Sequence, residues 1–106
     1  MNVYAYTCEP HEHPHVCDID PFQLTVIGQA SDYTVIDRID NRLFVVDNAA
    51  TPIDAACAYI NWFYGQVRAC KWDEEEAGWV ETDEFLPAAL AYDYIEMPLG
   101  WELVEG

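Results

Sequence analysis

Hydrophobic residues in the first half of the chain alternate with polar ones or form short blocks. These blocks are rich in Val, Ile, Tyr, Phe and Thr, which is typical of β-strands. Turn-forming residues separate them at Ser31-Asp32 and Asp40-Asn41. The pattern predicts strands at residues 3–7, 22–29, 33–39 and 43–47, and the last two should form a hairpin.

A helical pattern follows, and it predicts one main helix over residues 51–71. Thr51 is placed to be the N-cap, Pro52 suits the first helical position, and Asp54 favours the positive end of the helix dipole. Arg68 and Lys71 stand at the other end, where cations are favoured. Apolar residues recur at helical spacing and leave only a narrow polar stripe. We therefore expect this helix to be largely buried against a sheet.

The remaining pattern completes the expected fold. The continuous apolar block at 43–46 is typical of a strand covered on both faces, while Asp37 and Asp40 should lie toward the rim. Residues 82–90 predict a short second helix that is capped by Thr82 and interrupted, or started afresh, at Pro87, and residues 92–97 and 101–104 predict short strands. We expect an α+β fold in a single domain, residues 1–106, with a small antiparallel sheet of four or five strands packed on the main helix.

The net charge of the chain predicts what kind of partner it binds. The chain has 20 Asp and Glu against 4 Lys and Arg, a formal net charge of -16. It is also 52% hydrophobic and 14% aromatic, which predicts a folded core rather than an acidic disordered tail. Such a surface repels nucleic acid and membrane lipid and attracts basic surfaces. The abundant basic surfaces in a cell are those that hold nucleic-acid phosphates.

The acids are concentrated in the last third of the chain, where no Lys or Arg occurs after Lys71. Alternate residues of a strand are about 6.6 Å apart, close to the spacing of successive phosphates along a DNA strand, so a row of carboxylates can imitate a phosphate row. Two other interpretations remain open: a solvated surface that maintains solubility, and adaptation to high salt. The predicted partner-binding residues are Asp73, Glu74, Glu75, Glu76, Glu81, Asp83, Glu84, Asp93 and Glu96.

Large aromatic side chains lie among these acids and are candidates for anchors in an interface, although a small domain also needs such side chains for its core. The candidates are Trp72, Trp79, Phe85, Tyr92, Tyr94 and Trp101.

A second motif places two cysteines and all three histidines within ten residues: Cys8, His11, His13, His15 and Cys17. Cys and His are the preferred ligands of zinc, so the segment is a candidate metal site. Its spacing is not that of a zinc finger, and a Cys8–Cys17 disulfide or a plain polar surface loop are the alternatives. The other two cysteines, Cys57 and Cys70, fall within the predicted helix and should be reduced packing residues.

Catalysis has little support in the sequence. The chain has one serine, Ser31, and one lysine, Lys71, and it has no Gly-rich phosphate-binding loop. We therefore expect a protein that is not an enzyme and needs no cofactor. The start of the chain lacks the features of a secretory signal, and no run of residues is apolar enough for a membrane span, so we expect a cytoplasmic protein.

In size and acidity the whole chain resembles the small acidic proteins that bacteriophages encode against host defence, namely anti-CRISPR and anti-restriction proteins of the DNA-mimic type. The resemblance implies an inhibitor in the host bacterial cytoplasm that binds the basic DNA-binding site of a CRISPR effector or restriction enzyme, and binds neither nucleic acid nor membrane directly. The alternative is a zinc-binding or redox-sensitive adaptor whose acidity serves solubility or salt adaptation.

Overall fold

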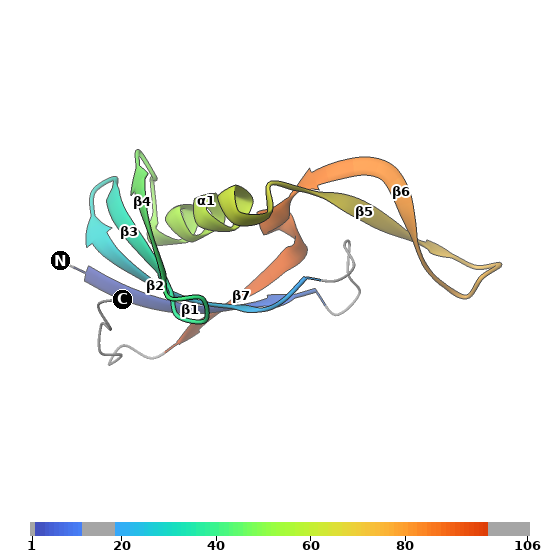
Figure 1. Ribbon diagram of the computed structural model, residues 1–106, viewed down its shortest axis with the longest axis horizontal. Coiled ribbons are helices and arrows are strands. Elements are labelled where there is room, and N and C mark those ends of the chain that lie inside the picture. The colour runs from blue at the N-terminus through green and yellow to red at the C-terminus, as the bar shows by residue number, and fades with distance from the viewer. Residues whose placement is uncertain (1, 12–18, 98–106) are drawn as a thin grey trace.

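A computed structural model describes residues 2–11 and 19–97 of the chain (Figure 1). The elements follow one another in the order β1 (Asn2–Pro10), β2 (Phe22–Gln29), β3 (Asp32–Asp37), β4 (Arg42–Asp47), α1 (Pro52–Tyr64), β5 (Gln66–Asp73), β6 (Gly78–Pro87), the 3-10 turn η1 (Ala88–Ala91) and β7 (Tyr92–Met97).

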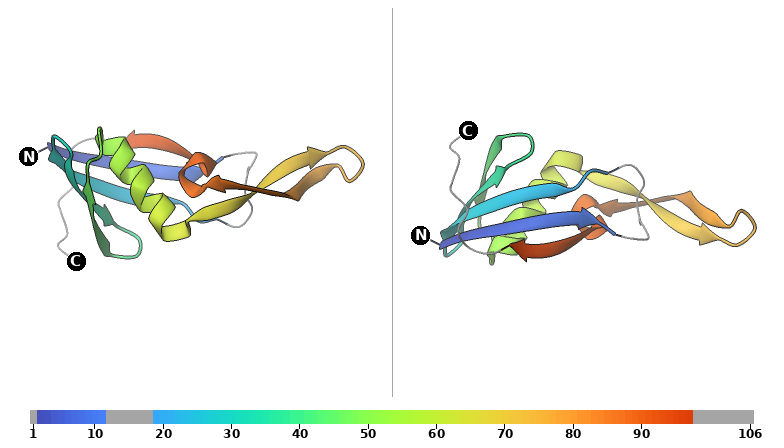
Figure 2. Two further views of the ribbon diagram at one scale, coloured as in Figure 1. Left: turned by 90° about the horizontal axis from the view of Figure 1, so that it is seen from above. Right: turned by 90° about the horizontal axis from the view of Figure 1, so that it is seen from below.

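Five of the strands form one antiparallel sheet in the order β4-β3-β2-β1-β7, and α1 lies across one face of it (Figure 2). Leu24 and Val26 of β2 are fully buried beneath Tyr59 and Ile60 of the helix. The expected antiparallel sheet packed on a main helix is confirmed, with five strands. The strand predicted at 101–104 lies outside the described residues.

The helix begins where the sequence predicts. Thr51 is the N-cap, with its hydroxyl oxygen accepting a hydrogen bond from the Asp54 amide at 3.2 Å, and Pro52 occupies the first helical position.

The predicted helix end at residue 71 is wrong, because α1 stops at Tyr64. Gly65 has a φ of 69°, a left-handed conformation that ends the helical ladder at little cost for glycine, and its amide donates to the Asn61 carbonyl. Arg68 and Lys71 therefore lie on strand β5, and so does Cys70, which was expected on the helix.

The predicted helix at 82–90 is also wrong, because most of this segment is strand β6, paired with β5. Thr82 caps no helix; its hydroxyl donates to the Ala69 carbonyl at 2.9 Å across the pair. The expected second helix is reduced to the single 3-10 turn η1, which follows Pro87.

Two burial predictions in the β3–β4 hairpin are wrong as well. On β4, Phe44 and Val46 pack toward the helix, whereas the alternate side chains Leu43 and Val45 point to the other face of the sheet and are 54% and 63% exposed instead of covered. Asp37 is fully buried instead of lying at the rim, whereas Asp40 is exposed as expected. Hydrophobicity alone does not show whether both faces of a strand are covered, and β4 also lacks a neighbouring strand on one side.

Strands β5 and β6 form a separate two-stranded sheet, the ribbon, which projects from the body formed by the five-stranded sheet and α1 (Figures 1 and 2). The molecule measures 52 × 25 × 20 Å, and its radius of gyration is 15.1 Å. A compact protein of this length has a radius of gyration of about 13 Å. The ribbon accounts for the elongated shape.

Candidate partner-binding ribbon

The tip of the ribbon is a tight turn that presents three consecutive glutamates. Asp73 and Gly78 are the last paired residues, and the chain turns through 74–77 between them. The Asp73 carboxylate accepts a hydrogen bond from the Glu75 amide at 2.9 Å, so it stabilises the turn. The side chains of Glu74, Glu75 and Glu76 are exposed to solvent.

A β-bulge interrupts the ribbon nearer its base. The pairing skips between Arg68 and Cys70, so that residues 82–84 of β6 lie opposite Ala69 alone. The Thr82 hydroxyl oxygen accepts from the Glu84 amide at 3.2 Å while it donates to Ala69. A bulge bends its strand and redirects side chains, and here Glu81, Asp83 and Glu84 all point into solvent.

The ribbon holds two cations against seven acids, a net charge of -5 over residues 66–87. One Arg68 Nη nitrogen lies 3.6 Å from Asp83 Oδ1 and 3.3 Å from the Thr82 carbonyl oxygen, and the guanidinium lies over the Phe85 ring at 5.0 Å. The side chains of Arg68 and Asp83 are well exposed, so water screens this pair strongly. Lys71 is exposed too. The two cations leave most of the ribbon's negative charge uncompensated.

Exposed aromatic rings lie among these acids. Trp72 is 53% exposed and Phe85 is 51% exposed. Trp79, directly opposite Trp72, is half-buried, and the two indoles meet edge to face at 5.8 Å between ring centres. Of the other aromatic candidates, Tyr92 is buried in the core and Tyr94 packs against it, so both belong to the body. Trp101 lies outside the described residues.

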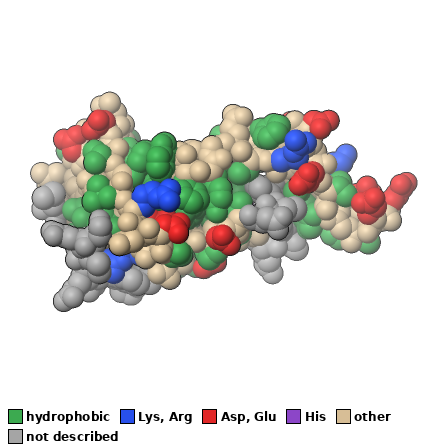
Figure 3. All heavy atoms as spheres, in the orientation of Figure 1, with side chains coloured by type: hydrophobic (Ala, Val, Ile, Leu, Met, Phe, Trp, Pro, Cys, Tyr) green, Lys and Arg blue, Asp and Glu red, His purple; other side chains and the backbone are tan. Residues whose placement is uncertain are grey.

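Seven of the nine predicted partner-binding residues therefore come together on the ribbon, and two do not. Asp93 and Glu96 are exposed on β7, which is the edge strand opposite β4 in the five-stranded sheet. Asp93 Oδ1 lies 3.0 Å from His11 Nδ1. Glu96 stands opposite Tyr6 and, after burial as the larger cause, helps to raise the pKa of Tyr6 to about 12. The space-filling view shows acids at the ribbon tip and further acids over the body (Figure 3).

Two of the five candidate zinc ligands are described, and both have other contacts. The Cys8 thiol is fully buried beneath α1, and this burial raises its pKa to about 12, with smaller contributions from Cys57 and Glu9. His11 Nε2 lies 2.8 Å from the Leu90 carbonyl oxygen, while Nδ1 faces Asp93. Across residues 2–11 and 19–97, no three His, Cys, Asp or Glu side chains gather as a metal site. His13, His15 and Cys17 lie outside these ranges, so zinc and the Cys8–Cys17 disulfide stay predictions.

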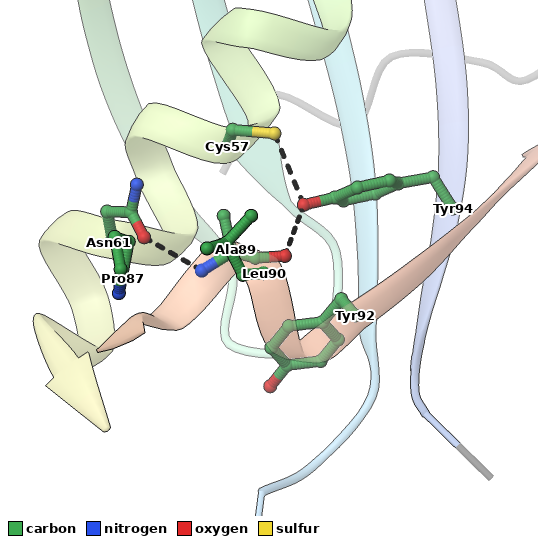
Figure 4. A pocket seen from close by; sticks show the side chains of 7 residues that line it. All are labelled: Cys57, Asn61, Pro87, Ala89, Leu90, Tyr92 and Tyr94. Atoms are coloured by element: carbon green, nitrogen blue, oxygen red, sulfur yellow. Dashed lines mark hydrogen bonds between the residues drawn. The ribbon is translucent and has the colours of Figure 1, made fainter. Parts of the chain in front are cut away.

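Sequence reasoning missed a pocket at the base of the ribbon, with a volume of about 340 Å³ (Figure 4). It lies between α1, the end of β6, η1 and β7. The residues that line the pocket are up to 37 positions apart in the sequence, so no local pattern predicts it. The only sequence signal at this place, where the ribbon meets the body, is Pro87 followed by a short apolar block. They are Cys57, Asn61, Pro87, Ala89, Leu90, Tyr92 and Tyr94.

None of the described helices has the length and apolar character needed to cross a membrane.

Comparisons of the chain with protein-family models, with curated proteins and with solved structures found no match.

Proposed function

We propose that this protein is an inhibitor that mimics nucleic acid and occupies the DNA-binding site of a host defence complex, such as a CRISPR effector or a restriction enzyme, in the bacterial cytoplasm. The observation that carries the proposal is the ribbon: seven exposed or half-exposed carboxylates and two exposed aromatic rings on one narrow projection outside the body.

The shape and the charge of the ribbon together support the proposal. A basic groove that binds a polynucleotide is suited to a ligand that is narrow and negatively charged. The two-stranded ribbon is narrow and has a net charge of -5. The whole-molecule charge of -16 speeds the encounter by long-range attraction. Trp72 and Phe85 then supply apolar area that is desolvated on contact.

The mechanism is competitive occlusion without chemistry. Lys and Arg side chains that would hold phosphates pair instead with the ribbon carboxylates, so DNA and this protein exclude one another from the same groove. The acids of the ribbon act as ligands for these cations, and no catalytic residue is part of the proposal.

The test is a charge reversal at the ribbon tip. The variant Glu74→Lys, Glu75→Lys, Glu76→Lys should fold normally, because all three side chains are exposed in a turn. Its matched control reverses three exposed acids of the body: Asp32→Lys, Asp40→Lys and Asp47→Lys. Both variants change the net charge equally, so a difference between them reports location rather than total charge.

Each immobilised protein is incubated with bacterial lysate and then washed with duplex DNA. We expect wild type and the body control to retain nucleic-acid-binding proteins, which the DNA then displaces. The tip variant should retain at least about tenfold less of these proteins. The captured protein should also lose DNA binding when wild-type chain is added. Equal retention by the tip variant, or indifference to DNA, would refute the proposal.

A further inference from the structure

The pocket at the base of the ribbon has a wall that is already fixed by hydrogen bonds. The Asn61 side-chain oxygen accepts from the Ala89 amide at 2.7 Å. The Tyr94 hydroxyl donates to the Ala89 carbonyl at 2.7 Å, and the Cys57 thiol donates to the Tyr94 hydroxyl at 3.2 Å (Figure 4). Because these groups bind one another, helix α1, η1 and β7 form a preorganised hollow.

Size and polarity restrict what this hollow accepts. Its volume of about 340 Å³ is at the small end of ligand pockets, which range from roughly 300 to 1,000 Å³. A cavity of about 150 Å³ already accommodates benzene, so one large side chain fits. None of the seven residues that line it is an Asp, Glu, Lys or Arg, and a charged group would lose its hydration there without an ionic partner. The pocket therefore favours one uncharged, apolar group.

Acidic side chains stand on both sides of the pocket. Pro87, part of its rim, comes three residues after Glu84 of the ribbon. On the other side, Tyr92 and Tyr94, which line the pocket, share their face of β7 with the exposed Glu96, whereas Asp93 points to the opposite face of the strand. The pocket thus lies between the ribbon acids and Glu96 on β7. A basic surface that covers both groups of acids also covers the pocket.

We propose that the pocket receives one apolar side chain, with an aromatic ring as the best fit, from the same basic protein surface that binds the ribbon. This inference rests on the proposed function and adds a specificity element to it. Arginines and lysines of the partner contact the carboxylates, and the apolar side chain among them enters the hollow between Pro87 and Leu90. Carboxylates supply attraction to many basic surfaces, whereas the pocket selects those with an anchor of the right shape.

Two synthetic heptapeptides serve as probes: six arginines with a central tryptophan, and six arginines with a central alanine. We expect the tryptophan peptide to bind wild-type protein about tenfold more tightly, as burial of one aromatic side chain provides. In NMR spectra it should also shift the backbone amide signals of Asn61, Ala89 and Leu90 more than the alanine peptide does.

The decisive variant is Leu90→Ala, which removes one wall of the pocket at a side chain that is 59% exposed. Leu43→Ala on β4 is its matched control, with the same change at 54% exposure and outside the pocket. The ratio of the affinities for the tryptophan and alanine peptides should fall to about twofold or less in Leu90→Ala and stay near the wild-type ratio in Leu43→Ala. A third variant, Trp72→Ala, tests whether the peptide indole stacks on the ribbon instead.

The outcomes separate the two proposals. Equal affinity of the two peptides for wild type, an advantage that survives Leu90→Ala, or one that disappears only in Trp72→Ala would each overturn the pocket inference and leave the ribbon proposal intact. Undiminished binding of both peptides to the variant with Glu74, Glu75 and Glu76 reversed to lysine would instead overturn the proposed function.

Discussion

One buried carboxylate, Asp37, ties the β3–β4 turn to the helix. Its Oδ1 accepts hydrogen bonds from the amides of Ile39 at 3.0 Å and Asp40 at 3.1 Å, and its Oδ2 accepts from the Tyr59 hydroxyl at 2.7 Å. Burial, and then this hydrogen bond, raise the pKa of Tyr59. Sequence reasoning expected Asp37 at the rim because aspartate is usually exposed, and its helix partner, 22 residues later, leaves no local signal.

We predict that Tyr59→Phe lowers the free energy of unfolding by about 1.5–3 kcal/mol, because Oδ2 of the buried carboxylate loses its partner. Urea unfolding of both proteins measures the difference. Tyr64→Phe is the control on the same helix: its hydroxyl accepts a 3.3 Å bond from the exposed Asp20 amide and interacts with the Tyr92 hydroxyl, both uncharged partners, so its loss should cost about 1 kcal/mol or less. Equal losses would contradict the role given to Asp37.

The buried Cys8 thiol makes stability depend on pH. Its pKa rises from an ordinary value of 9.0 to about 12, mainly through burial. Above pH 9 the unfolded chain therefore releases a proton that the folded chain keeps, so stability is complete below this pH and falls as the pH rises toward 12.

Between about pH 9 and 10, before most tyrosines of the unfolded chain ionise, this loss approaches 1.4 kcal/mol per pH unit. In Cys8→Ala the slope in this window should be shallower by about half a proton at pH 9 and by nearly one proton at pH 10, whatever the absolute cost of the substitution. Urea unfolding in a series of buffers gives the slope. An unchanged slope would show that Cys8 ionises equally in both states.

At the scale of elements, the end of α1 decides whether the chain has a ribbon at all. Gly65 combines a φ of 69° with open space around its missing Cβ, whose nearest contact would be the Asn61 carbonyl oxygen at 3.9 Å. Gly65→Ala should therefore act through backbone strain alone and destabilise the protein by about 1–3 kcal/mol. Thermal or urea unfolding measures it.

Gly78→Ala at the ribbon tip provides the comparison, because Gly78 lacks a positive φ and its Cβ would meet the Glu76 carbonyl at an ordinary 3.8 Å. Gly78→Ala should change the free energy of unfolding by no more than about 0.5 kcal/mol through the folded state. The lower conformational entropy of the unfolded chain with alanine adds a small stabilisation. Similar losses in the two variants would mean that the positive φ of Gly65 imposes no particular strain on an alanine at this position.

The strands of the first half and the start of the helix were predictable, because alternation and capping are local signals. The ribbon was not predicted, since the helical spacing of apolar residues runs on through Val67, and Arg68 and Lys71 stand where a helix end favours cations. Two signals favoured the hairpin: Gly65 itself, and two apolar blocks separated by the acidic turn 73–78. The concentration of acids was evident in the sequence, whereas their position on a projecting arm depends on where the helix ends.

At the scale of the whole molecule, the charge of -16 acts on folding and on binding with opposite signs. Carboxylates repel one another in the compact state, so added salt screens the repulsion and stabilises the fold. The same screening weakens attraction to a cationic partner. Adaptation to high salt makes a different prediction, namely that the protein is unfolded until salt is added.

We predict that, from about 0.05 to 0.5 M NaCl, the free energy of unfolding rises while affinity for the tryptophan heptapeptide falls by about tenfold or more. Urea unfolding and isothermal titration calorimetry at each salt concentration measure the two trends. In the variant with three lysines at the ribbon tip, binding should depend less steeply on salt, because fewer ion pairs form. An affinity that is insensitive to salt would exclude electrostatic recognition by the ribbon, and a chain that unfolds at 0.05 M NaCl would favour adaptation to brine.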